Sequence, residues 1–169
     1  MTLSFSIKWP DRMGDLAGQP NYFIEKIWGG VPEYLQGRYY DRFVEQHLQK
    51  FGDDWDYTLE AVTPKLHTIR LDPSNRWKSG MKIHPVINNR TPNRFQFAPT
   101  MECVSVQRIN IHYHWGGLAP SVRIDGKLLN EDDLLQLALN DGFPSVGAFF
   151  AYFNTDFSGN LIHWTDLKY

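Results

Sequence analysis

The chain has 169 residues, with 17 Lys and Arg against 19 Asp and Glu, a net charge of −2, and 42% apolar residues. This length predicts one domain with a buried core, and 15% aromatic residues argue against a disordered chain. No apolar run approaches the roughly 18 residues of a membrane span, and residues 1–10 lack the features of a secretory signal. We therefore expect a cytoplasmic protein, which the single cysteine, Cys103, also favours.

The charges are unevenly distributed along the chain. Between Lys65 and Arg94, seven basic residues accompany a single acid, Asp72, whereas residues 41–60 contain six acids and two basic residues. A basic segment on a mildly acidic body is one way to attract phosphate groups. Charges that simply solvate different faces of the protein account for the same pattern equally well.

The first half of the sequence predicts two helices. A short one is expected at about residues 23–28, after a loop rich in Gly, Asp and Pro. Apolar residues spaced three and four apart predict a longer helix from Glu33 to Phe51, and Gly52 is a natural C-terminal stop. Residues 53–63 place large apolar side chains at alternate positions among acids, which favours an extended segment.

The middle of the chain predicts β structure. Short segments at residues 66–70 and 81–86 are bounded by Pro and Gly, as strands often are. The longest strand is expected at residues 102–115, and its apolar face switches midway, which predicts a bulge or bend as in a small barrel. A tight hairpin is expected around Asp125 and Gly126.

Two helices and a closing strand are predicted for the C-terminal part. Asn130 can cap the first helix, which should stop near Asp141 and Gly142, and Ser145 can cap the second. Residues 161–164 have the composition of a strand. The complete pattern predicts one mixed α+β domain.

One segment, Pro64–Arg70 with the sequence PKLHTIR, resembles the ASCH domain family of PUA-like barrels. The family's marker is a lysine followed three positions later by threonine or serine at the mouth of a small barrel, and here it corresponds to Lys65 and Thr68. Residues 76–84, 104–111, 140–154 and 161–169 also look like family segments.

The resemblance implies a fold for the whole chain, residues 1–169. It implies an α+β domain with a small PUA-like mixed β-barrel, flanking helices and a helical insertion at about residues 32–63. It also implies a cleft for a nucleotide or RNA, and in some small members hydrolysis of the amide of acetylcytidine by a lysine, a threonine and a glutamate. Lys65 and Thr68 match that set, whereas the carboxylate position falls on Asp141, which is one methylene shorter.

The chemistry of such a set can be considered from the residues alone. A threonine hydroxyl needs a base, and Lys65 can serve only if burial or cationic neighbours such as Arg70, Arg76 or Lys78 lower its pKa from about 10.4. Because side chains three positions apart face opposite sides of a straight strand, Lys65 and Thr68 converge only on a turn. Asp141, at the negative end of a helix, is expected to have a raised pKa, as a general acid should. The alternative is that Asp141 only ends the helix and Thr68 is an ordinary strand residue.

Binding without catalysis would use basic and aromatic side chains. Phosphates would contact Arg70, Arg76, Lys78 and Arg90, and a base could stack on Trp77, for which a core position is equally compatible. We expect no metal site and no cofactor, because His112 and His114 share a strand face without a third ligand. Three other histidines, His67, His84 and His163, are expected to have structural roles.

Three functional hypotheses follow. The leading one is that the protein binds RNA or a modified nucleoside in a cleft near Lys65, Thr68 and Asp141. The second is an amidohydrolase acting on acylated cytidine, with Thr68 as nucleophile, Lys65 as base and Asp141 as acid. The third is a protein-interaction module, in which the helix at residues 33–51 docks a partner and the cleft is vestigial. The oligomeric state stays open.

Overall fold

The computed structural model describes residues 1–53, 55 and 63–169, which form an α+β fold as the sequence predicts. Most of the extended segment expected at residues 53–63 lies outside the described residues. Of that segment, Trp55 is buried, and its Nε1 donates a hydrogen bond to the hydroxyl of Tyr40 at 3.2 Å. No helix in the described part of the chain is long and apolar enough to cross a bilayer.

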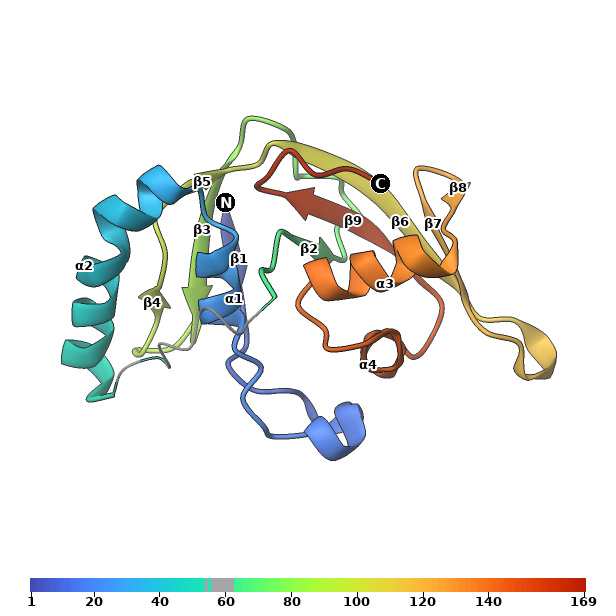
Figure 1. Cartoon of the computed structure of the whole chain (residues 1–169), viewed down its shortest axis with the longest axis horizontal. Coiled ribbons are helices and arrows are strands. Elements are labelled where there is room, and N and C mark those ends of the chain that lie inside the picture. The colour runs from blue at the N-terminus through green and yellow to red at the C-terminus, as the bar shows by residue number, and fades with distance from the viewer. Residues whose placement is uncertain (54, 56–62) are drawn as a thin grey trace.

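The described strands form two sheets (Figure 1). In the first, β3 pairs in parallel with β1 and antiparallel with β4 and β5. Its strands are β1 (Thr2–Ser4), β3 (Lys82–Ile87), β4 (Phe95–Gln96) and β5 (Met101–Glu102). The second sheet is antiparallel, in the order β2-β9-β6-β7-β8. Its strands are β2 (His67–Arg70), β9 (Phe157–His163), β6 (Ser105–His112), β7 (Ser121–Ile124) and β8 (Lys127–Leu128).

The passage of the chain from β5 to β6 joins the two sheets directly. The strand expected at residues 102–115 is shorter than predicted, because β6 covers Ser105–His112 without interruption, and the break lies at Cys103 and Val104, between β5 and β6, rather than midway. The Cys103 amide donates to the Met81 carbonyl at 2.8 Å on the first sheet, and the Val104 amide donates to the His163 carbonyl at 2.8 Å on the second. Among the described strands, no backbone ladder joins β1 to β2, so the two sheets are not closed into a barrel at that place.

Figure 1 shows α2 (Glu33–Phe51) at one edge of the molecule, α1 (Phe23–Gly29) beside β1, and α3 (Glu131–Asn140) and α4 (Val146–Tyr152) closer to the middle. α2 has the predicted bounds, and it packs with α1 beside the first sheet. The centres of the Trp28 and Tyr40 rings lie 5.1 Å apart in this contact. α3 and α4 lie over the second sheet. The predicted N-terminal loop contains a 3-10 turn, η1 (Asp11–Leu16), and a second one, η3 (Trp115–Gly117), follows β6.

Short-range sequence signals account for the starts of α3 and α4 and for the hairpin between β7 and β8. The Asp133 amide donates to Asn130 Oδ1 at 2.8 Å at the start of α3. The Ala148 amide donates to Ser145 Oγ at 3.1 Å at the start of α4. Asp125 and Gly126 have φ angles of 50° and 86°, the positive values that a tight turn between β7 and β8 requires.

Two apolar cores fill the molecule. One lies between the first sheet, α1 and α2, and contains Trp28, which is fully buried. The other lies between the second sheet, α3, α4 and η1, and contains Phe149, also fully buried. Phe23, at the start of α1, packs against both cores. The candidate site lies in this boundary region.

Candidate functional site

A cavity of about 380 Å³ lies beside the opening between β1 and β2. Lys65, Thr68 and Asp141 all line it, together with Arg70. The three residues that the sequence selected for catalysis therefore meet at one hollow. Its other walls are made by aromatic and amide side chains, which include Phe5, Phe23, Phe143, Tyr152, Phe153, Asn88 and Asn89.

Irregular backbone before β2 brings Lys65 and Thr68 to the same cavity. The Lys65 amide donates to the Lys26 carbonyl at 2.8 Å, and the Leu66 amide donates to the Asn140 carbonyl at 2.8 Å. These residues are thus held by the ends of α1 and α3, and β2 begins only after them. Side chains three positions apart face opposite sides only within a straight strand, and Lys65 lies before β2 begins. Lys65 and Thr68 can therefore line the same cavity.

Two glycines let the surrounding backbone approach Lys65. A Cβ on Gly30 would lie 2.4 Å from the Lys65 carbonyl oxygen. Gly142 has a φ of +89°, and a Cβ there would lie 2.9 Å from a ring carbon of Phe23 and 3.4 Å from Lys65 Cδ. Since side chains are disfavoured at both positions, glycine at the end of each helix is part of how the site is built.

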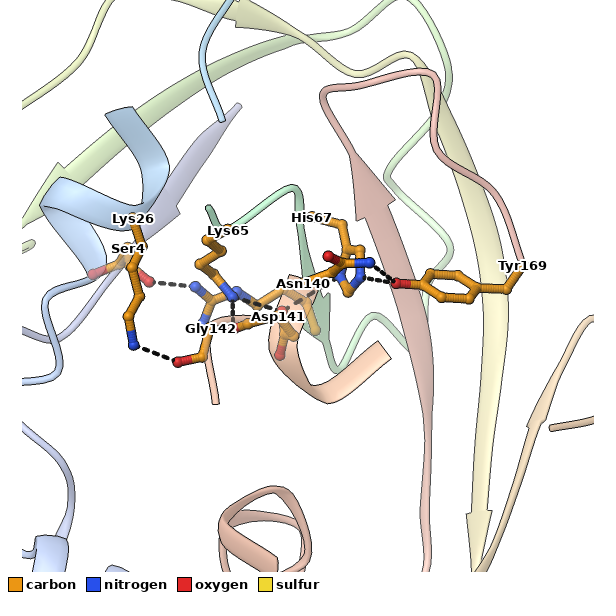
Figure 2. Close-up of polar contacts among 9 residues, drawn as sticks. Ser4, Lys26, Lys65, His67, Asn140, Asp141, Gly142 and Tyr169 are labelled. Atoms are coloured by element: carbon orange, nitrogen blue, oxygen red, sulfur yellow. Dashed lines mark hydrogen bonds and ion pairs between the residues drawn. The ribbon is translucent and has the colours of Figure 1, made fainter. Parts of the chain in front are cut away.

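Lys65 and Asp141 form a buried ion pair (Figure 2). Lys65 Nζ donates to Asp141 Oδ1 at 2.6 Å and also to the Asp141 main-chain oxygen. The two side chains are only 2% and 5% exposed. Burial lowers the pKa of Lys65 to about 8, although the charge of Asp141 acts in the opposite direction.

The expectation that Asp141 has a raised pKa is wrong. Burial alone would raise the pKa of this carboxyl, but the positive charge of Lys65 and the nearby imidazole of His67 outweigh burial and hold it below its usual range. The end of the helix favours a raised pKa, and the cation that contacts Asp141 reverses that direction. Asp141 is therefore a carboxylate at neutral pH and is not suited to donate a proton.

His67 connects this ion pair to the last residue of the chain (Figure 2). Its Nδ1 lies 3.6 Å from Asp141 Oδ1, and its Nε2 lies 2.8 Å from the hydroxyl oxygen of Tyr169. Asn140 Nδ2 donates to the same hydroxyl at 2.9 Å. The Tyr169 hydroxyl can then donate to His67 Nε2, which leaves the proton of a neutral imidazole on Nδ1, facing Asp141.

Burial lowers the pKa of His67, so the ring is neutral in the folded protein. This agrees with a structural role, although the ring also touches the candidate site. Sequence reasoning did not find Tyr169, Asn140 or Lys26, whose Nζ donates to the Gly142 carbonyl at 2.8 Å. Only the position of Asn140 beside Asp141 could have indicated any of them.

Thr68 is 4% exposed and lines the cavity. Within the described residues, its hydroxyl makes no hydrogen bond to another protein group. No protein group in the described residues therefore competes with a ligand for this hydroxyl. This is the position that either a ligand-binding group or a nucleophile would occupy.

The predicted phosphate-binding residues are divided among different places. Arg70 lines the cavity, its Nη2 donates to the Ser4 carbonyl at 2.7 Å, and its guanidinium lies 5.0 Å from the centre of the Phe5 ring. Arg90 is exposed and directly follows Asn88 and Asn89 of the cavity wall. Of these two cations, only Arg70 lines the cavity.

Arg76 and Lys78 do not line the cavity. Arg76 is largely exposed, with Nε 3.4 Å from Asp72 Oδ1, and Lys78 borders a separate hollow beside β6. Trp77 is 5% exposed and belongs to the first core, which was one of its two expected positions. Because its ring is packed there, a base cannot stack on it. The spacing of the basic segment alone could not show which side chains share a face.

His112 and His114 have separate partners. His112 Nδ1 lies 2.9 Å from Asp156 Oδ2, and His114 Nε2 lies 3.0 Å from Ser121 Oγ. Within residues 1–53, 55 and 63–169, no three His, Cys, Asp or Glu side chains come together as ligands for a metal ion.

Comparisons of the chain with protein-family models, with curated proteins and with solved structures find no match. The resemblance to ASCH domains therefore rests on the sequence segments quoted above. The function has to be argued from the geometry of the cavity.

Proposed function

We propose that the cavity binds the base and sugar of a nucleoside, either as a modified nucleoside or as part of RNA, in the manner of an ASCH-type cleft. The observation that carries the proposal is that Lys65, Thr68, Asp141 and Arg70 line one hollow with aromatic walls. Its volume of about 380 Å³ is in the range of small-molecule sites. The proposal includes a cytoplasmic location, where RNA and nucleosides are present.

The walls of the cavity offer each kind of contact that a nucleoside needs. Aromatic rings such as Phe23 and Tyr152 can stack on a base, and the amides of Asn88 and Asn89 can hydrogen bond to its edge. The Thr68 hydroxyl adds a donor and acceptor without a competing protein partner. The cavity thus combines stacking with a small number of polar contacts.

The state of Lys65 favours binding over catalysis at neutral pH. With a pKa of about 8, roughly nine in ten Lys65 side chains are protonated at pH 7. The ammonium is held by two oxygens of Asp141 and has no lone pair with which to remove a proton from Thr68. A cationic Lys65 can instead donate its remaining hydrogen to a bound ligand.

Calorimetric titration with cytidine and acetylcytidine tests the proposal. We expect saturable binding that Thr68→Val weakens by up to about tenfold, the effect of one hydrogen bond. The matched control is Thr100→Val, because Thr100 is exposed and lies outside this cavity. Absence of binding to either nucleoside or to single-stranded RNA at ~10 mM ligand would overturn the proposal.

The lowered pKa of Lys65 favours hydrolysis of acylated cytidine as a second candidate. In that reaction neutral Lys65 would take the proton of Thr68 while Oγ forms a bond to the acyl carbon. The C–N bond would then break with return of the proton to the departing nitrogen, and water would release the acid from the acyl-threonine. Asp141 would position Lys65, because it is already a carboxylate and does not act as the acid.

The pH profile distinguishes this candidate from binding alone. Release of acetate from acetylcytidine should rise with pH, reach half of its maximum near pH 8, where half of the Lys65 side chains are neutral, and approach a plateau about one unit higher. Thr68→Val should abolish it, and Thr100→Val should not. Binding without any release of acetate across this range would leave the binding proposal alone.

A further inference from the structure

A second hollow adjoins the proposed nucleoside cavity. It has a volume of about 280 Å³. Four residues line both hollows: Ile69, Arg70, Tyr152 and Phe153. Arg12, from η1, lines its other side. A molecule longer than a nucleoside could therefore continue past Arg70 toward Arg12.

The two hollows together have an excess of positive charge. Among the described residues that line them, the cations are Lys65, Arg70 and Arg12, and the single acid is Asp141. Lys65 and Asp141 neutralise each other in their ion pair. The charges of Arg70 and Arg12 remain to attract an anion.

Both arginines are held in place by aromatic rings. The guanidinium of Arg12 lies 4.2 Å from the centre of the Tyr152 ring, and that of Arg70 lies 5.0 Å from the centre of the Phe5 ring. One nitrogen of Arg70 donates to Ser4, while its Nε is buried and has no hydrogen-bond partner in the described part of the protein. Arg70 thus keeps unused donors beside the shared wall.

We propose that the ligand carries a phosphate group that lies between Arg70 and Arg12, so that the protein prefers nucleotides to nucleosides. This inference rests on the proposed function, because the base and sugar occupy the first cavity. Arginine suits the task, since its planar fork can donate two parallel hydrogen bonds to phosphate oxygens. The phosphate can belong to a mononucleotide or to an RNA chain.

Titration with cytidine, with cytidine monophosphate and with a short single-stranded cytidine RNA tests the inference. We expect both phosphate-bearing ligands to bind at least about tenfold tighter than cytidine, the effect of one or two charge-assisted hydrogen bonds. Raising the salt concentration should reduce this ratio, because the gain is electrostatic. Tighter binding of the RNA than of the mononucleotide would identify an RNA chain as the source of the phosphate, and equal binding would identify a free nucleotide.

Arg12→Gln should lower the ratio of nucleotide to nucleoside affinity severalfold, because Arg70 alone then contacts the phosphate. Arg12 is exposed, so circular dichroism should show a folded variant. The matched control is Arg123→Gln, on β7, which lines neither hollow and should keep the wild-type ratio. If cytidine binds but the phosphate gives no gain, or if Arg12→Gln keeps the gain, this inference fails and the proposed function stands. If none of the three ligands binds, and acetylcytidine does not bind either, both fail.

Discussion

The hydroxyl oxygen of Tyr169 lies 2.8 Å from Nε2 of His67, and the other nitrogen of that imidazole faces Asp141. The backbone of Tyr169 is fixed as well, because its amide donates to Gln107 Oε1 at 3.1 Å and its carbonyl accepts from Gln107 Nε2 at 3.1 Å. The last residue is thus bound to β6 by its main chain and to the candidate site by its side chain.

Tyr169→Phe should lower the free energy of unfolding by about 1–3 kcal/mol, because it leaves His67 and Asn140 without a shared partner. Urea unfolding measures the effect. Tyr34→Phe, at a side chain that is 75% exposed, should change stability by less than about 0.5 kcal/mol. Equal effects of the two variants would contradict the structural role of the Tyr169 hydroxyl.

Lys65→Met should destabilise the protein by about 3–5 kcal/mol, because it leaves the charge of Asp141 buried and unpaired. Lys82→Met is the matched control, since Lys82 and Glu102 form a similar pair at 2.8 Å but are 62% and 56% exposed. The control should cost at most about 1 kcal/mol.

A second change separates the charge of Asp141 from the packing of Lys65. The double variant Lys65→Met, Asp141→Asn removes the unpaired charge and should recover part of the lost stability. Chemical denaturation of all four proteins supplies the measurement. If Lys65→Met lowered the free energy of unfolding no more than Lys82→Met does, the result would contradict a buried ion pair between Lys65 and Asp141.

The pH dependence of stability should reflect His163, which is fully buried with both ring nitrogens unpaired in the described residues. Burial lowers the pKa of His163 to about 3, whereas in the unfolded chain it is about 6.5. Between these values the unfolded state binds a proton that the folded state does not, so stability falls as pH falls, by at most about 1.4 kcal/mol per pH unit.

His163→Leu should make the loss of stability between pH 6.5 and pH 5 shallower. Some dependence should persist, because burial also lowers the pKa of His67. The control is Ile162→Val, on the same strand, which should lower stability by about 1 kcal/mol without changing the slope. Urea midpoints at pH 7, 6 and 5 provide the comparison, and an unchanged slope in His163→Leu would refute the assignment.

Two tryptophans test the distinction between core and surface. Trp77→Ala should cost about 3–5 kcal/mol, because the ring is 5% exposed in the first core. Trp115→Ala should cost less than about 0.5 kcal/mol, because its side chain is 97% exposed. Thermal unfolding of the two variants should therefore differ clearly, and similar losses would contradict the placement of Trp77.

Sequence signals that act over a few residues predicted much of the fold. The caps at Asn130 and Ser145, the Asp125–Gly126 turn and the helix at Glu33–Phe51 all depend on neighbours within about four positions. The change of apolar face within residues 102–115 indicated a bend midway, which is wrong in position, because the strand breaks at Cys103 and Val104 and β6 continues through Ser105–His112.

Contacts between distant residues were harder to predict. The parallel pairing of β1 with β3 joins residues more than 80 positions apart, and no local pattern selects that partner. The residues Lys65, Thr68 and Asp141 came from a family resemblance and do meet, but the direction of the Asp141 pKa depended on distances that only the fold supplies. The sequence around Trp77 was compatible with a core position and with base stacking. Its burial in the structure shows that the core position is the correct one.

Phe23 packs against both apolar cores and also forms a wall of the candidate cavity. A ligand in the cavity would therefore contact the boundary between the two halves of the protein, each built around one of these cores. Saturation with such a ligand should slow amide hydrogen exchange in β1 and β9 together, so that the halves open as a single cooperative unit.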